Sequence, residues 1–193
     1  GCLDEAACNY CPNCTFDDAT CFYPGECGDC ENIELTQSIS IPAGWSIFST
    51  YICPFEPNME SVLQELVNNN ELIIVKNNMG MVYWPEYSIN NIGSIINGQG
   101  YLIKTTNETT LTINGDTLNY DYPININAGW SMVGFLHKEP YDIASMLSPL
   151  SSNLVIVKDF EGNVYWPIFG LNSIGLMHPG QGYQLKTLLS DNF

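Results

Sequence analysis

The sequence predicts a mostly β, α+β protein, in which a small disulfide-rich module precedes a tandemly duplicated, pseudo-two-fold β-rich domain with one short helix per repeat. Three observations predict this architecture. Cysteines crowd the segment that ends at Cys30, two long segments repeat each other, and each repeat alternates apolar and polar residues between glycine- and proline-rich turns. We divide the chain into a module over 1–33, a first repeat with a connecting hairpin over 34–122, and a second repeat over 123–193.

Composition excludes several function classes. The 193 residues carry 21 acidic side chains, five lysines and no arginine, so the formal net charge is −16. A protein that binds nucleic acid needs clustered cations to displace counterions from phosphates, and an anionic membrane surface makes the same demand. No apolar run reaches the roughly 18 residues of a membrane span. We therefore expect no nucleic-acid partner and no membrane insertion.

The duplication is visible as two repeated blocks. Ile39–Ser46 recurs as Ile124–Ser131 at an offset of 85, and Leu72–Thr105 recurs as Leu154–Thr187 at an offset of 82. Within the second block, 18 of the 34 aligned positions are identical. Chance does not produce that density, so the two segments are copies of one unit. The second copy has lost three residues between the two blocks.

Periodicity and turn residues predict the elements of each repeat. Apolar residues at helical spacing indicate a short helix over Met59–Val67 and a weaker counterpart over Tyr141–Leu150. Leu72–Lys76 and Met81–Trp84 read as a hairpin that turns at Gly80. Since proline has no amide hydrogen for a strand ladder, this hairpin ends after Trp84, and its counterpart in the second repeat ends in the same way.

The remaining strands follow the Gly-Gln-Gly turns and connect the repeats. We expect last strands over Tyr101–Lys104 and Tyr183–Lys186. Between the copies, Thr110–Ile113 and Leu118–Tyr122 read as a hairpin around Asn114-Gly115-Asp116. Phe193 lies about where the strand corresponding to Thr110 would start, so we expect the second repeat to expose an unfilled sheet edge. Exposed edges recruit strands from other chains.

Repeated aromatic residues have two interpretations. We expect Trp45 and Trp130 to be core residues, because a duplicated core needs the same large apolar side chains twice. The aromatic residues of the two Tyr-Trp-Pro segments are either core residues or faces that stack on sugar rings. These candidate ligand-facing residues are Tyr83, Trp84, Tyr165 and Trp166.

Four of the five lysines occupy equivalent positions in the two repeats. They are Lys76, Lys104, Lys158 and Lys186. In so acidic a chain, we expect them to pair with nearby carboxylates or to cover aromatic faces with their aliphatic stems.

The cysteine-rich module is too short and too poor in aliphatic residues to fold on a core alone, so it needs disulfides or a metal. The eight cysteines are Cys2, Cys8, Cys11, Cys14, Cys21, Cys27, Cys30 and Cys53. Seven cysteines cannot pair among themselves. Cys53, whose counterpart is Lys138, therefore closes a fourth bridge onto the module, or one cysteine stays free or bonds to another chain.

The segment from Gly1 to Tyr23 resembles a short repeat of secreted bacterial surface proteins, with the pattern Gly-Cys-x-Asp, Asn-Tyr, Asp-Asp and Cys-x-Tyr. Its acidic and amide side chains are also similar to thrombospondin type 3 calcium repeats. The resemblance implies calcium, which takes about six to eight oxygen ligands. The candidate ligands are Asp4, Asn9, Asn13, Asp17 and Asp18. Two alternatives remain: a solvated acidic surface, or zinc at the two Cys-x-x-Cys pairs.

The duplicated signature resembles a paired domain of large bacterial proteins exported by the type IX route. It consists of Gly-Trp-Ser, Val-Tyr-Trp-Pro and Gly-Gln-Gly-Tyr, and it spans about residues 38–190. The resemblance implies an extracellular, cell-surface location and carries no established catalytic role.

Function is expected to be structural. The sequence contains no Gly-x-Ser-x-Gly elbow, Walker loop or His-Glu-x-x-His motif. We expect a non-enzymatic adhesin or filament subunit, stabilised by calcium and disulfides, whose partners are copies of itself or other surface proteins. The alternative is a carbohydrate-binding module of a larger secreted protein, with a polysaccharide as partner. Candidate glycosylation sites are Asn107, in a sequon, and Thr117, at the expected exposed turn.

Overall fold

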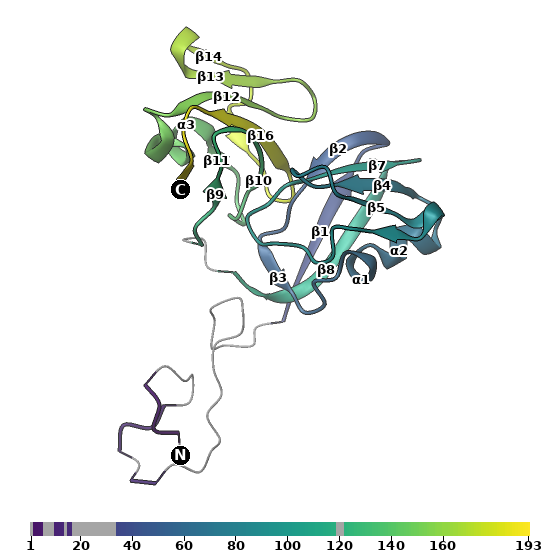
Figure 1. Cartoon of the computed structure of the whole chain (residues 1–193), viewed down its shortest axis with the longest axis vertical. Coiled ribbons are helices and arrows are strands. Elements are labelled where there is room, and N and C mark those ends of the chain that lie inside the picture. The colour runs from purple at the N-terminus through teal and green to yellow at the C-terminus, as the bar shows by residue number, and fades with distance from the viewer. Residues whose placement is uncertain (1, 6–9, 14, 17–33, 119–121) are drawn as a thin grey trace.

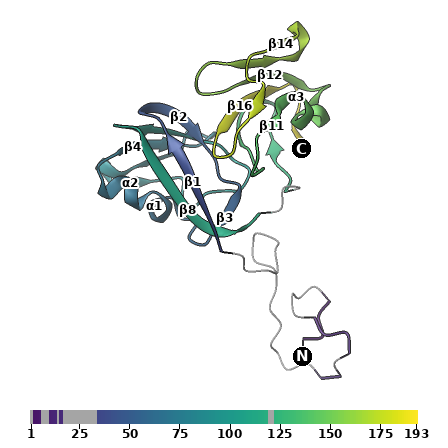
Figure 2. The ribbon, with the colours of Figure 1, turned by 180° about the vertical axis from the view of Figure 1, so that it is seen from behind.

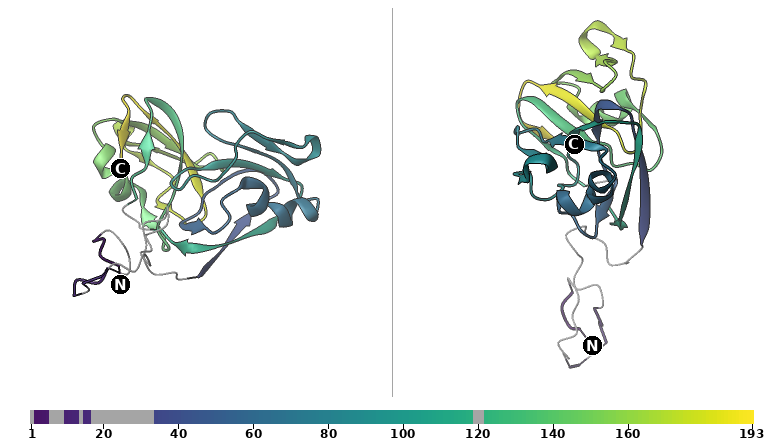
Figure 3. Two further views of the ribbon diagram at one scale, coloured as in Figure 1. Left: turned by 60° about the horizontal axis from the view of Figure 1, so that its bottom comes forward. Right: turned by 90° about the vertical axis from the view of Figure 1, so that its right-hand side faces the viewer.

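The computed structural model describes residues 2–5, 10–13, 15–16, 34–118 and 122–193. Strands dominate this part of the chain, and the three α-helices within it are short. Figure 1 shows the two repeats as neighbouring bodies, the first in blue and teal and the second in green and yellow, and they stay adjacent in both views of Figure 3. The mostly β, α+β fold predicted from the sequence is confirmed.

A five-stranded antiparallel sheet forms the larger part of the first repeat, with strand order β2-β7-β4-β5-β6. The strands are β2 (Gly44–Phe48), β7 (Tyr101–Thr105), β4 (Leu72–Lys76), β5 (Val82–Trp84) and β6 (Ile89–Asn90). The predicted hairpin of β4 and β5 is present, and its Gly80 has a φ of 79°, a left-handed conformation that glycine adopts without strain. Pro85 follows β5 and opens a 3₁₀ turn over Pro85–Tyr87.

The second repeat builds the same sheet, with strand order β10-β16-β12-β13-β14. The strands are β10 (Gly129–Gly134), β16 (Gly182–Thr187), β12 (Leu154–Lys158), β13 (Val164–Trp166) and β14 (Leu171–Asn172). A 3₁₀ turn over Pro167–Phe169 follows β13, as in the first repeat. Even an irregularity recurs: the register of β4 on β7 shifts after Leu72, and that of β12 on β16 shifts after Leu154.

A smaller sheet distinguishes the two repeats. In the first repeat, β8 (Thr109–Thr117) lies between β1 (Leu35–Ile41) and β3 (Ile52–Pro54) and pairs antiparallel with both. Figure 2 shows β1 and β8 side by side. In the second repeat, the counterpart of β1 is β9 (Asn125–Ile126), which pairs with β17 (Asp191–Asn192) over two residues.

A further pair of short strands in the second repeat joins β11 (Tyr141–Asp142) to β15 (Leu176–Met177). The corresponding contact in the first repeat is a single bridge between Asn58 and Ser94. Both contacts tie the start of a helix to the loop that precedes the Gly-Gln-Gly segment.

The predicted hairpin between the repeats is wrong, because β8 runs without a turn through Asn114-Gly115-Asp116. Gly115 opposes Pro54 of β3, and a Cβ atom added to it would lie 2.1 Å from the carbonyl oxygen of Cys53. The glycine is therefore required by the close approach of two strands, a use that the sequence does not distinguish from a turn.

The helices follow the prediction in position but differ in number. The first repeat has two, α1 (Met59–Val62) and α2 (Gln64–Asn68), separated by Leu63. The second repeat has α3 (Ile143–Met146) and then a 3₁₀ turn over Ser148–Leu150. Pro149 in that turn lacks the amide hydrogen that a continuing α-helix would use. The prediction of one short helix per repeat is wrong for the first repeat.

Equivalent helix caps show where the second repeat is shorter. The side chain of Asn58 accepts a hydrogen bond at the start of α1, and that of Asp142, at an offset of 84, does so at the start of α3. The offset is 85 before the helix and 82 after it. The second repeat has therefore lost one residue before its helix and two after it.

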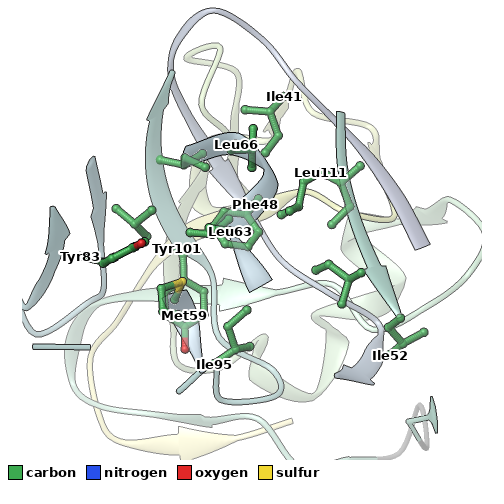
Figure 4. Packing of buried hydrophobic residues seen from close by; sticks show 14 residues of the cluster. Ile41, Phe48, Ile52, Met59, Leu63, Leu66, Tyr83, Ile95, Tyr101 and Leu111 are labelled. Carbon is green, nitrogen blue, oxygen red and sulfur yellow. The ribbon is translucent and has the colours of Figure 1, made fainter. Parts of the chain in front are cut away.

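Each repeat has its own hydrophobic core. In the first core, Met59, Leu63 and Leu66 from the helical segment pack toward Phe48 and Tyr101 of the sheet (Figure 4). The second core contains the counterparts of the three helical residues, Ile143, Leu147 and Leu150. Each helix therefore covers one face of its five-stranded sheet.

The Gly-Gln-Gly segments join the two repeats to each other. Gln181 of the second repeat forms a strand bridge with Phe48, and Gln99 of the first repeat forms the equivalent bridge with Val133. The amide of Gly134 donates to the carbonyl of Gly98 at 2.8 Å. Each segment thus extends a strand of the opposite repeat, so the pseudo-two-fold relation is built into the junction.

Ser49 adds side-chain hydrogen bonds to this junction. Its hydroxyl donates to the carbonyl oxygen of Gln181 at 2.6 Å and accepts from the amide of Phe135 at 3.1 Å. The counterpart of Ser49 in the second repeat is Gly134, which has no side chain to make these bonds. At the junction, therefore, the backbone bridges run in both directions between the repeats, whereas the side-chain hydrogen bonds of Ser49 come from the first repeat and have no counterpart at Gly134.

A buried tyrosine holds each Gly-Gln-Gly turn. The hydroxyl of Tyr101 accepts a hydrogen bond from the amide of Ile96 at 2.8 Å, and that of Tyr183 accepts from His178 at 2.9 Å. Tyr183 also donates to the side chain of Gln181 at 3.0 Å. Burial raises the pKa of Tyr101 and raises that of Tyr183 to about 12, since a phenolate in the core would lose its water.

Candidate functional site

A groove of about 370 Å³ lies in the second repeat. Tyr122, His137, Met146 of α3 and Phe193 are among the residues that line it. Phe193 lies beside α3 in both Figure 1 and Figure 2. The groove therefore lies next to the pair of β9 and β17.

Phe193 pairs with Ile124 at the side of this groove. The amide of Phe193 donates to the carbonyl of Ile124 at 3.3 Å, and the amide of Ile124 donates to the carbonyl of Phe193 at 2.9 Å. The equivalent pair in the first repeat is Leu111 with Ile39. Phe193 thus holds the position of the third residue of β8.

The first repeat has a cavity of about 350 Å³ at the corresponding place. Val62, the counterpart of Met146, lines this cavity together with Thr112, Ile113 and Asn114 of β8. Along β8, Leu111, Ile113 and Gly115 are buried, while Thr112 and Asn114 are exposed. Each repeat therefore has a cavity of similar volume beside its helical segment.

Aromatic rings form one wall of the groove. The imidazole ring of His137 stacks between Phe135 and Tyr141, with ring centroids 5.4 Å apart on each side. Phe135 is fully buried, whereas Tyr141 is 46% exposed. The stack runs from the core of the second repeat to its surface, and it gives the wall both apolar area and hydrogen-bonding groups.

A second surface feature is a pair of tryptophans, one per repeat. Trp45 is 42% exposed and Trp130 is 46% exposed, so the prediction that both are core residues is wrong. Both lie on the outer face of their sheet, where Lys104 is the cross-strand neighbour of Trp45 and Lys186 that of Trp130. A repeated aromatic residue can serve a repeated surface as well as a repeated core.

Lysine side chains lie over these two rings. The ammonium nitrogens of Lys76 and Lys104 are 5.3 and 5.6 Å from the centroid of Trp45, and that of Lys158 is 5.2 Å from Trp130. These distances fit cation–π contacts. The expectation that equivalent lysines cover aromatic faces is confirmed for these three.

The aromatic residues predicted to face a ligand lie elsewhere. Tyr83 belongs to the first core and is 6% exposed (Figure 4), so it does not offer its ring to solvent. Tyr165 packs against the second core. Trp84 and Trp166 are half-buried, and each ring meets the edge of the aromatic residue three positions on, Tyr87 or Phe169, at 4.7 Å.

The indole nitrogen of Trp84 is buried and has no hydrogen-bond partner among the described residues. Its N–H group therefore does not point toward a sugar in the surrounding solvent. Of the two pairs of tryptophans, Trp45 and Trp130 are the more exposed, although lysine ammonium groups lie over both rings.

The cysteine-rich module is described only in part. The candidate calcium ligands Asp4 and Asn13 are described and exposed, whereas Asn9, Asp17 and Asp18 lie outside the described residues. Within the described ranges, no group of three or more His, Cys, Asp or Glu side chains is arranged to hold a metal ion. Calcium binding stays a prediction.

Disulfide pairing also stays a prediction. None of the three described cysteines, Cys2, Cys11 and Cys53, is a free thiol. The five others, which are Cys8, Cys14, Cys21, Cys27 and Cys30, lie outside the described residues. The amide of Cys11 donates to the carbonyl of Cys2 at 2.9 Å, so these two cysteines are neighbours in the fold.

The two candidate glycosylation sites differ in their surroundings. Asn107 is exposed, between β7 and β8. Thr117 does not lie at a turn, because it is the last residue of β8, pairs with Ile52 and is half-buried. The expectation of an exposed turn at Thr117 is wrong for the same reason that the predicted hairpin is wrong.

Across the described part of the chain, no helix is both long enough and apolar enough to span a bilayer. In comparisons with known protein families, curated proteins and solved structures, nothing matched this chain.

Sequence reasoning did not identify the residues that surround this groove. Three separated segments supply them, and nothing in the sequence indicates that His137 and Met146 meet beside Phe193. The alignment of the two repeats does place Leu111 and Phe193 at equivalent positions of the small sheets.

Proposed function

We propose that this chain is a non-enzymatic structural or adhesive protein of the bacterial cell surface, a subunit of an extracellular filament. The observation that carries the proposal is the duplication, since both repeats build a five-stranded sheet of the same strand order. Proteins built from stacked repeats commonly present extended binding surfaces.

Two further observations support this function. The export-type signature of both repeats and the calcium-type pattern of the module resemble secreted surface proteins. The two repeats also interlock through reciprocal strand bridges, which suits a part that transmits force between neighbours. Calcium and disulfides would stabilise the N-terminal module in the same setting.

The state of assembly tests this proposal. Light scattering after size-exclusion chromatography, together with electron microscopy, should show oligomers that grow with protein concentration in calcium. Chelation should reduce them if the calcium module contributes to assembly. A chain that stays monomeric at every concentration, with and without calcium, would overturn the proposal.

Intact mass under denaturing, non-reducing conditions tests the disulfides separately. Four internal bridges make the monomer about 8 Da lighter than the reduced chain. Covalent multimers that collapse on reduction would instead indicate bridges between chains. Eight free thiols would contradict the extracellular location.

A carbohydrate-binding module is the second candidate function, and the exposed tryptophans favour it. Trp45 and Trp130 have partly exposed rings with lysine ammonium groups over them, an arrangement suited to an acidic sugar. Retention on a glycan array that the substitutions Trp45→Ala and Trp130→Ala abolish would establish it. Retention that survives both substitutions would exclude these rings as the site.

A further inference from the structure

We propose that the outer faces of the two five-stranded sheets bind a carboxylated polysaccharide, whose carboxylates accept hydrogen bonds from the lysine ammonium groups beside Trp45 and Trp130. This proposal rests on the second candidate function, because it names the class of sugar that these faces would take. It does not depend on filament assembly.

Positive charge is concentrated in the two large sheets. Their ten strands contain four of the five lysines and none of the 21 acidic residues of the chain. The four are Lys76, Lys104, Lys158 and Lys186. In a chain with a net charge of −16, these strands therefore form a local cationic region, which attracts anions.

The lysines lie on the face of each sheet that points away from its core. Along β7, Tyr101 and Ile103 belong to the first core, so the alternation of a strand places Lys104 on the opposite face. Lys186 of β16 alternates in the same way with residues of the second core. Both sheets therefore present their positive charge outward.

Cross-strand pairing places the same three types of side chain next to one another on each outer face. In the first repeat, Lys104 pairs with Trp45 of β2 on one side and with Ile74 of β4 on the other. The corresponding row of the second repeat consists of Trp130, Lys186 and Ile156. The two repeats therefore preserve an aromatic ring, a cation and an aliphatic side chain in one order.

The aliphatic side chain of each row forms an apolar floor. Ile74 is 6% exposed and Ile156 is 8% exposed, although neither belongs to the core cluster of its repeat. Their neighbours on the outer face therefore cover them. Apolar area with a few polar groups suits a sugar acid, because its ring has apolar C–H faces and its carboxylate accepts hydrogen bonds.

The ammonium groups are placed to bind such a carboxylate. Those of Lys76 and Lys104 lie 5.3 and 5.6 Å from the centroid of Trp45, and that of Lys158 lies 5.2 Å from that of Trp130. A ring attracts a cation through its quadrupole, whereas an ammonium group also has three N–H donors for oxygen acceptors. Charge-assisted hydrogen bonds to a carboxylate are stronger than those to neutral hydroxyls, so an acidic sugar is preferred over a neutral one.

The duplication favours a polymer over a single sugar. One chain presents the same set of residues twice, once in each repeat. A long polysaccharide with carboxylates along its length can contact both faces, and its second contact forms at a high effective concentration. The binding of a polymer should therefore be tighter than that of a short oligosaccharide.

A pair of matched polysaccharides tests the role of the carboxylates. The intact chain is passed over immobilised polygalacturonate and over its methyl ester, in which the carboxylates are blocked, with a chelator present to prevent calcium bridges. We expect binding to polygalacturonate that is at least about tenfold tighter than binding to the ester and that weakens as salt is added. Equal affinity for the two polysaccharides, or binding to neither, would overturn the inference.

Matched substitutions locate the site. Lys76→Gln and Lys158→Gln should each weaken binding to polygalacturonate about threefold or more, and together about tenfold or more. Lys138→Gln removes the same charge outside the two sheets and should change the affinity less than about twofold. Circular dichroism checks that the variants fold. Equal losses in Lys76→Gln and Lys138→Gln would overturn the outer faces as the site.

Competition with polyglutamate separates a polysaccharide from an acidic peptide, because polyglutamate carries carboxylates without sugar rings. We expect it to compete about tenfold less well than soluble polygalacturonate. Equal competition would overturn a polysaccharide as the ligand. Failure of this inference differs from failure of the second candidate function. Retention of neutral sugars that depends on Trp45 and Trp130, without preference for carboxylates, refutes only the inference, whereas no retention of any glycan refutes both.

Discussion

The first and second repeats share a five-stranded sheet of identical strand order, but they complete their smaller sheets differently. In the first repeat, β8 spans nine residues and binds two neighbouring strands. In the second repeat, β17 spans two residues and binds one. The larger sheet is therefore the part of the unit that two divergent copies preserve.

The largest expected difference between the repeats concerns the equivalent residues Leu111 and Phe193. Leu111 is 1% exposed within the first core, whereas Phe193 is half-buried beside the groove. We expect Leu111→Ala to lower the free energy of unfolding by about 3 kcal/mol and Phe193→Ala by about 1 kcal/mol. Urea denaturation followed by circular dichroism measures both.

Leu189→Ala supplies the control for this pair, because Leu189 is 70% exposed and its truncation should change the free energy of unfolding very little. Equal losses for Leu111→Ala and Phe193→Ala would contradict the difference in burial.

At the junction the two repeats cannot be compared separately, because each Gly-Gln-Gly segment contacts the opposite repeat. A Cβ atom on Gly182 would lie 2.5 Å from the Cγ2 atom of Ile47 and 3.1 Å from the Cα atom of Gly100. We expect Gly182→Ala to lower the free energy of unfolding by about 2 to 3 kcal/mol, since the added methyl group would overlap the side chain of Ile47 and press on the backbone of Gly100. The loss is measured by urea denaturation.

Gly162 provides the matched control for this substitution. Its φ is 93° and nothing lies within 4 Å of an added Cβ atom, so Gly162→Ala should cost only the backbone strain of about 1 kcal/mol. If the two substitutions cost the same, the close contact at the junction does not matter for stability.

The sequence could predict those features that depend on neighbouring residues. The β4–β5 hairpin follows from alternating residues around Gly80, and the end of β5 follows from Pro85. It could not predict those that depend on distant contacts. Gly115 has the composition of a turn but lies opposite Pro54, and Trp45 has the composition of a core residue but lies on the outer face of a sheet.

The candidate site was harder to predict. The alignment of Leu111 with Phe193 only places the two residues at equivalent positions of the small sheets. The walls come from segments that fold together only in three dimensions, so neither His137 nor Met146 could be assigned to the site in advance. The role of the Gly-Gln-Gly segments at the junction was hidden because each pairs with the other repeat.

A smaller effect should appear at alkaline pH, where the buried tyrosines titrate. Burial raises the pKa of Tyr183 to about 12, above the value of 10.0 for a free tyrosine. Between these values the unfolded chain releases a proton that the folded chain retains, so the free energy of unfolding falls as the pH rises from about 10 to 12. Tyr183→Phe should remove this part of the pH dependence.

The same substitution tests the hydrogen bond of the turn. Near neutral pH, Tyr183→Phe should cost about 1 to 2 kcal/mol, because the amide of His178 loses its partner. Tyr87→Phe serves as the control, since Tyr87 is 58% exposed. Denaturation across this pH range should show identical curves for Tyr87→Phe and the wild type. An unchanged alkaline slope in Tyr183→Phe would contradict the assignment.

The smallest expected effect is the stabilisation by the lysine–tryptophan contacts, which should be the same in the two repeats. The Lys76 ammonium lies 5.3 Å from the centroid of Trp45, and the Lys158 ammonium lies 5.2 Å from that of Trp130. Because the two contacts have nearly equal lengths and the two rings are similarly exposed, each contact should stabilise the folded state by about 0.5 kcal/mol. Double-mutant cycles that combine a lysine-to-glutamine with a tryptophan-to-alanine substitution measure the two coupling energies. Since Lys138 has no lysine counterpart in the first repeat, a cycle of Lys138→Gln with Trp130→Ala sets the baseline. Coupling energies that differ by more than this baseline would mean that Lys104, whose ammonium also lies over Trp45, changes the contact of Lys76.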